Sequence, residues 1–261
     1  MAQPLGQHFL KNLSAIDRIV DELNISKGEA VIEIGPGRGA LTLPLARRCK
    51  QVGAKLIAIE KDPGLADSLK LLVFSGKENT EIIYGDVLRE LPAVVSRYQL
   101  KANSYKLVGN IPYYITGAIL RTISELENKP IMTVLMTQKE VAERVCAVNG
   151  KMNLLAAATQ IWSKTKILFL LSPKEFDPPP KVWSAVIKME TNLVSARKED
   201  LENYYRKIKT IFKQPRKTLL NNLVEGGVGK EEAKKVLASL KLSPSARAQD
   251  LSTEDILSLN F

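Results

Sequence analysis

The chain has 261 residues, 45% of them hydrophobic and 25% charged, which allows one large domain or one domain with a smaller one. No apolar run reaches the roughly 20 residues that a membrane span requires, and the first ten residues lack a signal-peptide pattern, so we expect a cytoplasmic protein without a membrane partner. The single histidine and the two distant cysteines fit no metal site, whereas the net charge of +10 favours nucleic acid or another anionic partner.

The first half of the chain alternates between predicted helices and strands. Apolar residues at helical spacing predict a helix over 13–23. Short β-branched runs with helix-length stretches between them then predict strands at 31–34, 56–59, 82–84 and 107–108. This alternation indicates an α/β fold with a mostly parallel sheet.

Each of these four strands is followed or ended by glycine or by a polar side chain. The residues are Gly35, Glu60, Asp86 and Asn110, and successive members are about 25 residues apart along the chain. Ligands of open α/β sheets bind beyond the carboxyl ends of the strands. We therefore expect the four residues to converge on one crevice.

The second half of the chain changes from strands to helices. Strands are predicted at 131–136, 167–171 and 182–189, and Pro178-Pro179-Pro180 separates the last two. After about residue 192 the pattern predicts helices over 201–212, 215–224, 230–240 and 253–259, the last capped by Ser252 or Thr253. We expect a catalytic domain over residues 1–192 and a small helical domain over 193–261.

A glycine-rich loop follows the first predicted strand and precedes a helix, with the sequence Glu33-Ile34-Gly35-Pro36-Gly37-Arg38-Gly39. Glycines let a ligand approach the backbone closely, although such a loop occurs in many nucleotide-binding folds. Glu60 is suited to accept hydrogen bonds from both hydroxyls of a ribose, and Asp86 to accept from an adenine amino group. An NAD-dependent dehydrogenase remains compatible with these residues, although the dinucleotide spacing and an acid/base histidine in the body of the chain are missing.

The loop, together with Ile59-Glu60-Lys61-Asp62 and Gly85-Asp86, resembles the first three motifs of class I S-adenosylmethionine methyltransferases. Gly6-Gln7-His8-Phe9-Leu10 resembles a further cofactor motif in which asparagine is common at the position of His8. The resemblance implies S-adenosylmethionine as cofactor, with Gly35 beneath its methionine part, Glu60 at the ribose and Asp86 at the adenine. The full set of expected cofactor contacts is His8, Leu10, Gly35, Gly37, Glu60, Lys61, Asp86, Val87 and Asn110.

Asn110-Ile111-Pro112-Tyr113 is the most specific feature of the sequence. The lone pair of an exocyclic adenine amine is delocalised into the ring, so acceptors for its N–H groups are needed to expose that lone pair. The Asn110 side-chain carbonyl and a main-chain carbonyl are suited to this, Pro112 fixes the backbone direction, and Tyr113 offers a flat face for the base. Catalysis is then mainly the alignment of nitrogen, methyl group and sulfur.

This motif resembles the signature of amino-group methyltransferases, and four further stretches resemble the small-subunit rRNA adenine N6,N6-dimethyltransferase family. They are residues 138–144, 176–186, 216–219 and 247–252, and the likeness extends from about Gly6 to Leu257. It implies dimethylation of two adjacent adenines in the 3′-terminal helix of 16S rRNA, within the immature 30S subunit. In that family Phe176 would lie near the target base, and Trp183 stands where a polar residue is frequent.

Two other functions remain open besides the dehydrogenase. One is a 23S rRNA adenine N6-methyltransferase of the macrolide-resistance type, and the other is a ribosome assembly factor that keeps the fold without catalysis. The role of residues 203–220 is also open, because their six basic residues and absence of acidic residues suit contact with RNA phosphates but also suit an ordinary solvated helix face. Nothing in the sequence requires more than a monomer.

Overall fold

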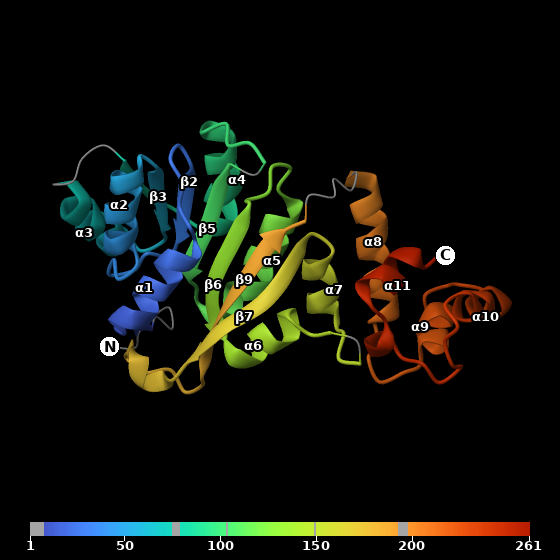
Figure 1. Cartoon of the computed structure of the whole chain (residues 1–261). Helices are drawn as coiled ribbons and strands as arrows, with labels where there is room; N and C mark the ends of the chain where they lie inside the picture. The colour runs from blue at the N-terminus through green and yellow to red at the C-terminus, as the bar shows by residue number, and fades with distance from the viewer. Residues whose placement is uncertain (1–7, 75–78, 103, 149, 193–197) are drawn as a thin grey trace. The chain divides into compact units, whose positions relative to one another are not determined.

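The computed structural model describes residues 8–261 except 75–78, 103, 149 and 193–197 (Figure 1). Residues Gly6 and Gln7 of the predicted cofactor motif lie outside the described part. The chain forms two compact units, one of Met1–Ala142 and Lys164–Thr191 and the other of Glu143–Ser163 and Asn192–Phe261. The last passage between the units lies between Thr191 and Asn192, one residue before the predicted boundary, whereas residues 143–163, predicted as part of the first domain, group with the helical unit.

The first unit is built on a seven-stranded sheet, which confirms the predicted α/β fold. Its strands are β2 (Ala30–Ile34), β3 (Lys55–Glu60), β4 (Thr80–Tyr84), β5 (Tyr105–Asn110), β6 (Met132–Gln138), β7 (Ser163–Leu171) and β9 (Ser184–Thr191). They lie in the order β4-β3-β2-β5-β6-β9-β7. The strands from β4 to β6 pair in parallel and β9 pairs antiparallel to β6. The chain order reverses between β2 and β5, which is where ligands of such sheets bind.

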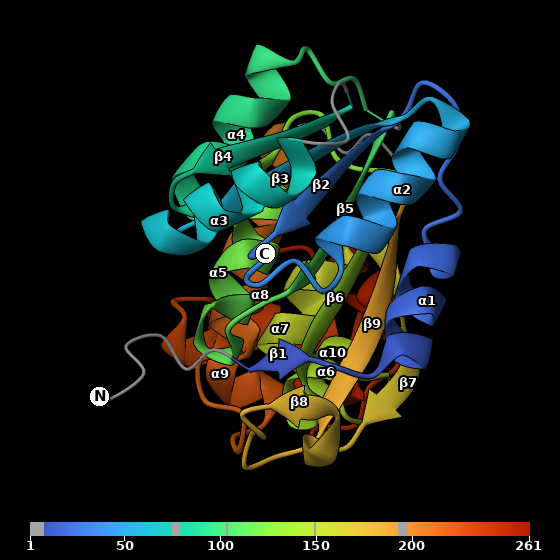
Figure 2. The same ribbon diagram turned by 90° about the vertical axis from the view of Figure 1, so that its left-hand side faces the viewer.

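Helices cover both faces of this sheet. They are α1 (Leu13–Glu22), α2 (Thr42–Val52), α3 (Pro63–Phe74), α4 (Val87–Arg97), α5 (Thr116–Glu125) and α6 (Lys139–Val145). Figures 1 and 2 show α1 and α2 on one face and α4 and α5 on the other. The central strands β2, β3, β5 and β6 are consequently buried on both sides, and β2 has no exposed residue.

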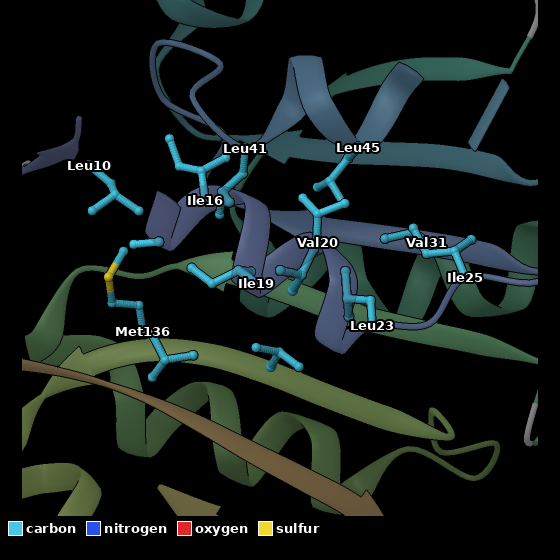
Figure 3. Close-up of a cluster of buried hydrophobic side chains, with 14 of the residues drawn as sticks. Leu10, Ile16, Ile19, Val20, Leu23, Ile25, Val31, Leu41, Leu45 and Met136 are labelled. Atoms are coloured by element: carbon cyan, nitrogen blue, oxygen red, sulfur yellow. The ribbon is translucent and has the colours of Figure 1, made fainter. Parts of the chain in front are cut away.

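Helix α1 illustrates how the sequence pattern produces this packing. Asn12 caps the helix by accepting a hydrogen bond from the Ala15 amide at 3.1 Å. The apolar residues at helical spacing, Ile16, Ile19 and Val20, are buried and belong to a core cluster that includes residues of α2 and of β2. Figure 3 shows these side chains directed toward α2 and the sheet. Burying each such side chain stabilises the fold by about 1.5–3 kcal/mol.

A second, two-stranded sheet was not predicted from the sequence. It pairs β1 (Phe9–Leu10) antiparallel to β8 (Phe176–Asp177), with Leu10 opposite Phe176. A 3-10 turn η2 (Pro173–Glu175) precedes β8, and the Glu175 carboxylate accepts a hydrogen bond from the Asn12 side chain at 2.7 Å. This small sheet, visible as β1 and β8 in Figure 2, ties the start of the described chain to a segment about 170 residues later.

The second unit is helical, as expected for its C-terminal part. It contains α7 (Leu154–Gln160), α8 (Lys198–Ile211), α9 (Leu219–Glu225), α10 (Lys230–Ser239), the 3-10 turn η3 (Ala248–Asp250) and α11 (Thr253–Ser258). Ser252 caps α11 as predicted, and α9 begins four residues later than predicted because Thr218 provides its cap. Among the described helices of the whole chain, none is long and apolar enough to span a membrane.

Candidate active site

A pocket of about 250 Å³ lies at the carboxyl edge of the large sheet, beyond the ends of β2, β3 and β5. The four strand-end residues predicted to converge all line it. So does every other residue expected at the cofactor or the target base, with the exception of Phe176. The spacing of the strand ends in the sequence therefore located the pocket.

The glycine loop forms one wall of the pocket and is held by Glu60. The Gly37 amide donates a hydrogen bond to Glu60 Oε2 at 2.9 Å. Gly37 has a φ of +57°, and a Cβ placed there would lie 2.8 Å from Cε1 of the Phe9 ring. Only glycine fits both the backbone conformation and the close approach of β1.

Glu60 is buried, with 4% of its surface exposed, yet both of its carboxylate oxygens are held by the backbone. Oε2 accepts from Gly37 and Oε1 accepts from the Asp62 amide at 2.8 Å. An ionised carboxylate has about four acceptor positions, so two remain for a ligand. These two acceptor positions suit a pair of vicinal hydroxyls such as those of a ribose.

Asp86 stands on the other side of Glu60 as the N-cap of α4. Its Oδ1 accepts from the Leu88 amide at 3.0 Å, and its Oδ2 forms an ion pair with Lys61 Nζ at 2.8 Å. The hydrogen bond from Lys61, followed by that from Leu88, lowers the pKa of the Asp86 carboxyl below its ordinary value. Asp86 is therefore an ionised acceptor at neutral pH, suited to the N–H groups of an adenine.

Glu33 also lines the pocket, and the sequence did not predict a site role for it. Its exposed fraction is 1%, and among the described residues its Oε2 has no hydrogen-bond partner. Burial raises the pKa of this carboxyl from 4.5 to about 8, the neighbouring Thr42 hydroxyl offsets part of the effect, and the charge of Glu60 adds to it. A pKa of about 8 favours the protonated form of Glu33 at neutral pH.

Asn110 ends β5 with its side-chain amide in a defined orientation. Its Nδ2 donates a hydrogen bond to the main-chain oxygen of His8 at 2.8 Å. Because that oxygen can only accept, the amide nitrogen must face it, and the carbonyl Oδ1 is directed elsewhere as an acceptor. The preceding Gly109 allows β5 to approach β2, since a Cβ there would lie 2.6 Å from the Ile34 oxygen.

Tyr113 lies one turn beyond Asn110, in the 3-10 helix η1 (Tyr113–Ile115). Its hydroxyl is 2.6 Å from Oγ of Ser184 at the start of β9, and burial raises its pKa above the ordinary value. The tyrosine therefore remains a neutral phenol. Its ring faces that of His8, with 6.2 Å between centroids and 24° between planes.

The structure does not bring Phe176 into this pocket. It is 1% exposed and packs in the core cluster that contains α1, as an ordinary core aromatic does. Its predicted place near the target base stays a prediction. Trp183 is 51% exposed beside Ser184, and nothing in the structure explains why tryptophan stands there.

No group of three or more histidine, cysteine, aspartate or glutamate side chains that could hold a metal occurs among the described residues. In the second unit, the six bases of residues 203–220 fall into two groups. Lys207 donates to the Leu259 oxygen and Lys217 forms an ion pair with Glu225. The other four are exposed and form what we call the basic strip: Arg206, Lys209, Lys213 and Arg216.

Comparison with known proteins gives a consistent result over nearly the whole chain. A family model described as ribosomal RNA adenine dimethylase matches residues 2–260. The ribosomal RNA small subunit methyltransferase A of Dehalococcoides mccartyi is 36% identical over 255 residues, covering 96% of this chain and 84% of the relative. The protein of the same name from Mycoplasma capricolum is 35% identical over 258 residues, covering 97% of this chain and 94% of the relative.

Solved structures agree on the fold. The crystal structure of the 23S rRNA methyltransferase ErmE is similar with a TM-score of 0.75 and 25% identity, covering 96% of this chain and 97% of that one. A dimethyladenosine transferase from Plasmodium falciparum is similar with a TM-score of 0.78 and 24% identity, covering 97% and 96% of the two chains.

Proposed function

Because the chain belongs to the ribosomal RNA adenine dimethylase family, we propose that it dimethylates the N6-amino groups of two adjacent adenines in the 3′-terminal helix of 16S rRNA. The relatives at 35–36% identity carry a small-subunit name, whereas the 23S methyltransferase is 25% identical. This difference favours the small-subunit substrate over the 23S alternative. The observation that carries the proposed chemistry is the fixed orientation of the Asn110 amide.

The methyl donor of the chain is S-adenosylmethionine, which supplies an activated methyl group when bound. The hydrogen-bond acceptors of the pocket fit this molecule: Glu60 has two free acceptor positions for the ribose hydroxyls, and Asp86 is an ionised acceptor for the adenine amine. Gly37 lets Phe9 of β1 pack against the loop, because a side chain at position 37 would collide with the Phe9 ring. The expected contacts of Leu10, Lys61 and Val87 are also on the pocket wall.

The target adenine is positioned by the segment after β5. Asn110 Oδ1 accepts a hydrogen bond from the N6 amine, which draws the nitrogen lone pair out of conjugation with the ring. The Tyr113 ring supports the base by stacking, worth about 1–3 kcal/mol per base. After methyl transfer the nitrogen carries a positive charge and releases its proton readily, so no general base of unusual pKa is required. The residues contribute mainly by alignment.

The helical unit is proposed to bind RNA through the basic strip, whose four exposed cations suit contacts with phosphates. The substrate within the cell is proposed to be the immature 30S subunit, which places the enzyme in the cytoplasm and late in small-subunit assembly. A monomer suffices for this activity, because all residues assigned to the two ligands come from one chain.

The test is incubation of the protein with unmethylated 30S subunits, and separately with 23S rRNA, in the presence of labelled S-adenosylmethionine. Mass spectrometry of nuclease digests should locate dimethyladenosine at two adjacent positions of 16S rRNA and nowhere in 23S rRNA. Label confined to 23S rRNA would support the macrolide-resistance type instead. Absence of label in both would support the assembly-factor interpretation.

A substitution separates the target site from the cofactor site. Asn110→Ala should abolish methyl transfer while the affinity for S-adenosylhomocysteine, measured by calorimetry, stays within a few-fold of the original. Asn128→Ala is the matched control, since Asn128 precedes β6 at the opposite, amino edge of the sheet. Loss of cofactor affinity in Asn110→Ala would show that this amide belongs to the cofactor site.

A further inference from the structure

Tyr114 is the second aromatic residue of the 3-10 helix η1 and belongs to neither of the two proposed ligand sites. It lines the pocket, and yet it is 71% exposed. Among the described residues its phenol oxygen has no hydrogen-bond partner, whereas that of Tyr113 is bonded to Ser184. Tyr114 therefore lies at the rim of the pocket with most of its ring in solvent.

The backbone that carries Tyr114 is fixed by buried hydrogen bonds. The Thr116 hydroxyl donates to the Tyr113 oxygen at 3.0 Å, and its Oγ1 lies 2.8 Å from Oγ1 of Thr137 in β6. Both threonines are buried. The next residue, Gly117, is exposed, and a Cβ placed there would have no atom within 4 Å. The ring thus projects from a rigid support with open space at the start of α5, which lowers the entropic cost of binding a ligand.

Two cations lie in the same neighbourhood. Lys61 lines the pocket and is paired with Asp86, whereas Arg89, in the first turn of α4, is exposed and forms no ion pair with the described residues. The hydrogen bond with Asp86 raises the pKa of the Lys61 ammonium, Tyr114 adds to this effect and Arg89 opposes it, so both side chains lie within electrostatic range of Lys61. An exposed ring near an unpaired cation is the combination that binds single-stranded nucleic acid.

We propose that Tyr114 stacks on the nucleotide next to the target adenine, and that Arg89 contacts the phosphate that joins the two nucleotides. This inference rests on the proposed function and extends it to the neighbouring nucleotide. An adenine that enters the pocket leaves its neighbour in the strand without a stacking partner. Consecutive side chains of a 3-10 helix point roughly 120° apart, so Tyr113 supports the base inside the pocket while Tyr114 replaces the lost stack outside it.

The two tyrosines can be observed separately without methyl transfer. The full chain is labelled with 3-fluorotyrosine, and the resonances of Tyr113 and Tyr114 are assigned by their absence from the corresponding phenylalanine variants. The protein is saturated with S-adenosylhomocysteine and titrated with adenosine or with the dinucleotide adenylyl-(3′→5′)-adenosine. Adenosine should shift the Tyr113 resonance alone, whereas the dinucleotide should shift both.

The outcomes of this titration distinguish the proposal from the function on which it rests. A Tyr114 resonance that stays fixed while the dinucleotide shifts that of Tyr113 would overturn the proposal and leave the target site intact. A Tyr114 resonance that responds to S-adenosylhomocysteine but not to the dinucleotide would assign the ring to the cofactor. If neither nucleotide moves the Tyr113 resonance, the target site itself is wrong. Arg89→Gln should weaken binding of the dinucleotide and leave that of adenosine unchanged, and equal dinucleotide affinities would remove Arg89 from the site.

Substitutions give an independent test on unmethylated 30S subunits. Tyr114→Ala should lower kcat/KM by roughly 5- to 150-fold, the range expected for one lost base–aromatic stack, and Tyr114→Phe should retain most of the activity. The affinity of both variants for S-adenosylhomocysteine should stay within a few-fold of the original. Tyr84→Ala is the matched control, because Tyr84 is 58% exposed at the end of β4 and does not line the pocket. An unchanged kcat/KM in Tyr114→Ala, or a loss that follows weaker cofactor binding, would refute the assignment.

Discussion

Replacing Glu33 by glutamine should stabilise the protein, and by more as the pH rises. The carboxyl is buried at 1% exposure, and its pKa is raised from 4.5 to about 8 by that burial. In the unfolded chain the group ionises near pH 4.5, so at higher pH the native state must retain a proton that the unfolded state has released. Glutamine has the same shape and no proton to lose, and it therefore avoids this cost.

The size of the effect follows from the two pKa values. One pKa unit corresponds to 1.36 kcal/mol, so at pH 7 the native state of the original protein is penalised by about 3 kcal/mol relative to the unfolded chain. Below pH 4.5 the penalty is absent, and above pH 8 it reaches its full value of about 5 kcal/mol. The stability associated with protonated Glu33 is thus complete at acid pH and is lost as the pH rises toward 8.

Urea unfolding of the original protein and of Glu33→Gln at pH 5, 7 and 8.5 measures this penalty. The contributions of the other titrating groups cancel when the free energies of unfolding of the two proteins are subtracted. The variant should gain about 4 kcal/mol relative to the original between pH 5 and 8.5. A difference that does not change with pH would refute the conclusion that Glu33 is neutral in the pocket. Glu81→Gln is a suitable control, since Glu81 is partly exposed and ion-paired with Lys55.

Three further predictions concern the loop, the core and the basic strip. Gly37→Ala should weaken S-adenosylhomocysteine binding at least ten-fold by calorimetry, because the new methyl group meets the Phe9 ring at 2.8 Å, and unchanged affinity would contradict this. Lys106→Met should cost about 3–5 kcal/mol in urea unfolding because it leaves Glu29 without its 2.6 Å partner; adding Glu29→Gln should recover most of the loss. Changing the basic strip to glutamine should reduce the slope of log affinity for 30S subunits against log salt by about 3, and an unaltered slope would exclude this surface.

Much of the first unit was predictable because parallel strands bury both faces and end at one edge. Their β-branched runs located β2 to β6, and the polar residues at their ends located the pocket. Buried strands of this kind are visible in the sequence as short hydrophobic, β-branched runs. The positions of Glu60 and Asn110 at the strand ends can therefore be predicted without knowing how the strands pair. The resemblance to a methyltransferase family then identified the cofactor and the target base, which the spacing of the residues alone does not determine.

Features that depend on contacts between distant segments were not predictable in this way. Leu10 and Phe176 pair between two strands of only two residues each, and strands this short show no recognisable pattern in the sequence. The same pairing buries Phe176 in the core, which its neighbours in the sequence do not indicate. The neutral state of Glu33 arises from its enclosure by other elements, and no spacing rule reports the pKa of a buried group.

The division of the two units along the chain has a consequence for how the protein is synthesised. The segment 143–163 belongs to the helical unit, yet it precedes most of β7 and all of β9. When β6 leaves the ribosome, its antiparallel neighbour β9 has therefore not yet been synthesised. The same holds for α7, whose buried Ala156 and Ala157 pack in a core formed with the helices from residue 198 onward. Neither unit is complete in the chain before the other has begun, so the segments of the two units alternate along the sequence. A protein truncated after residue 192 should therefore not fold as an independent catalytic domain, because α7 would lose the hydrophobic core against which it packs.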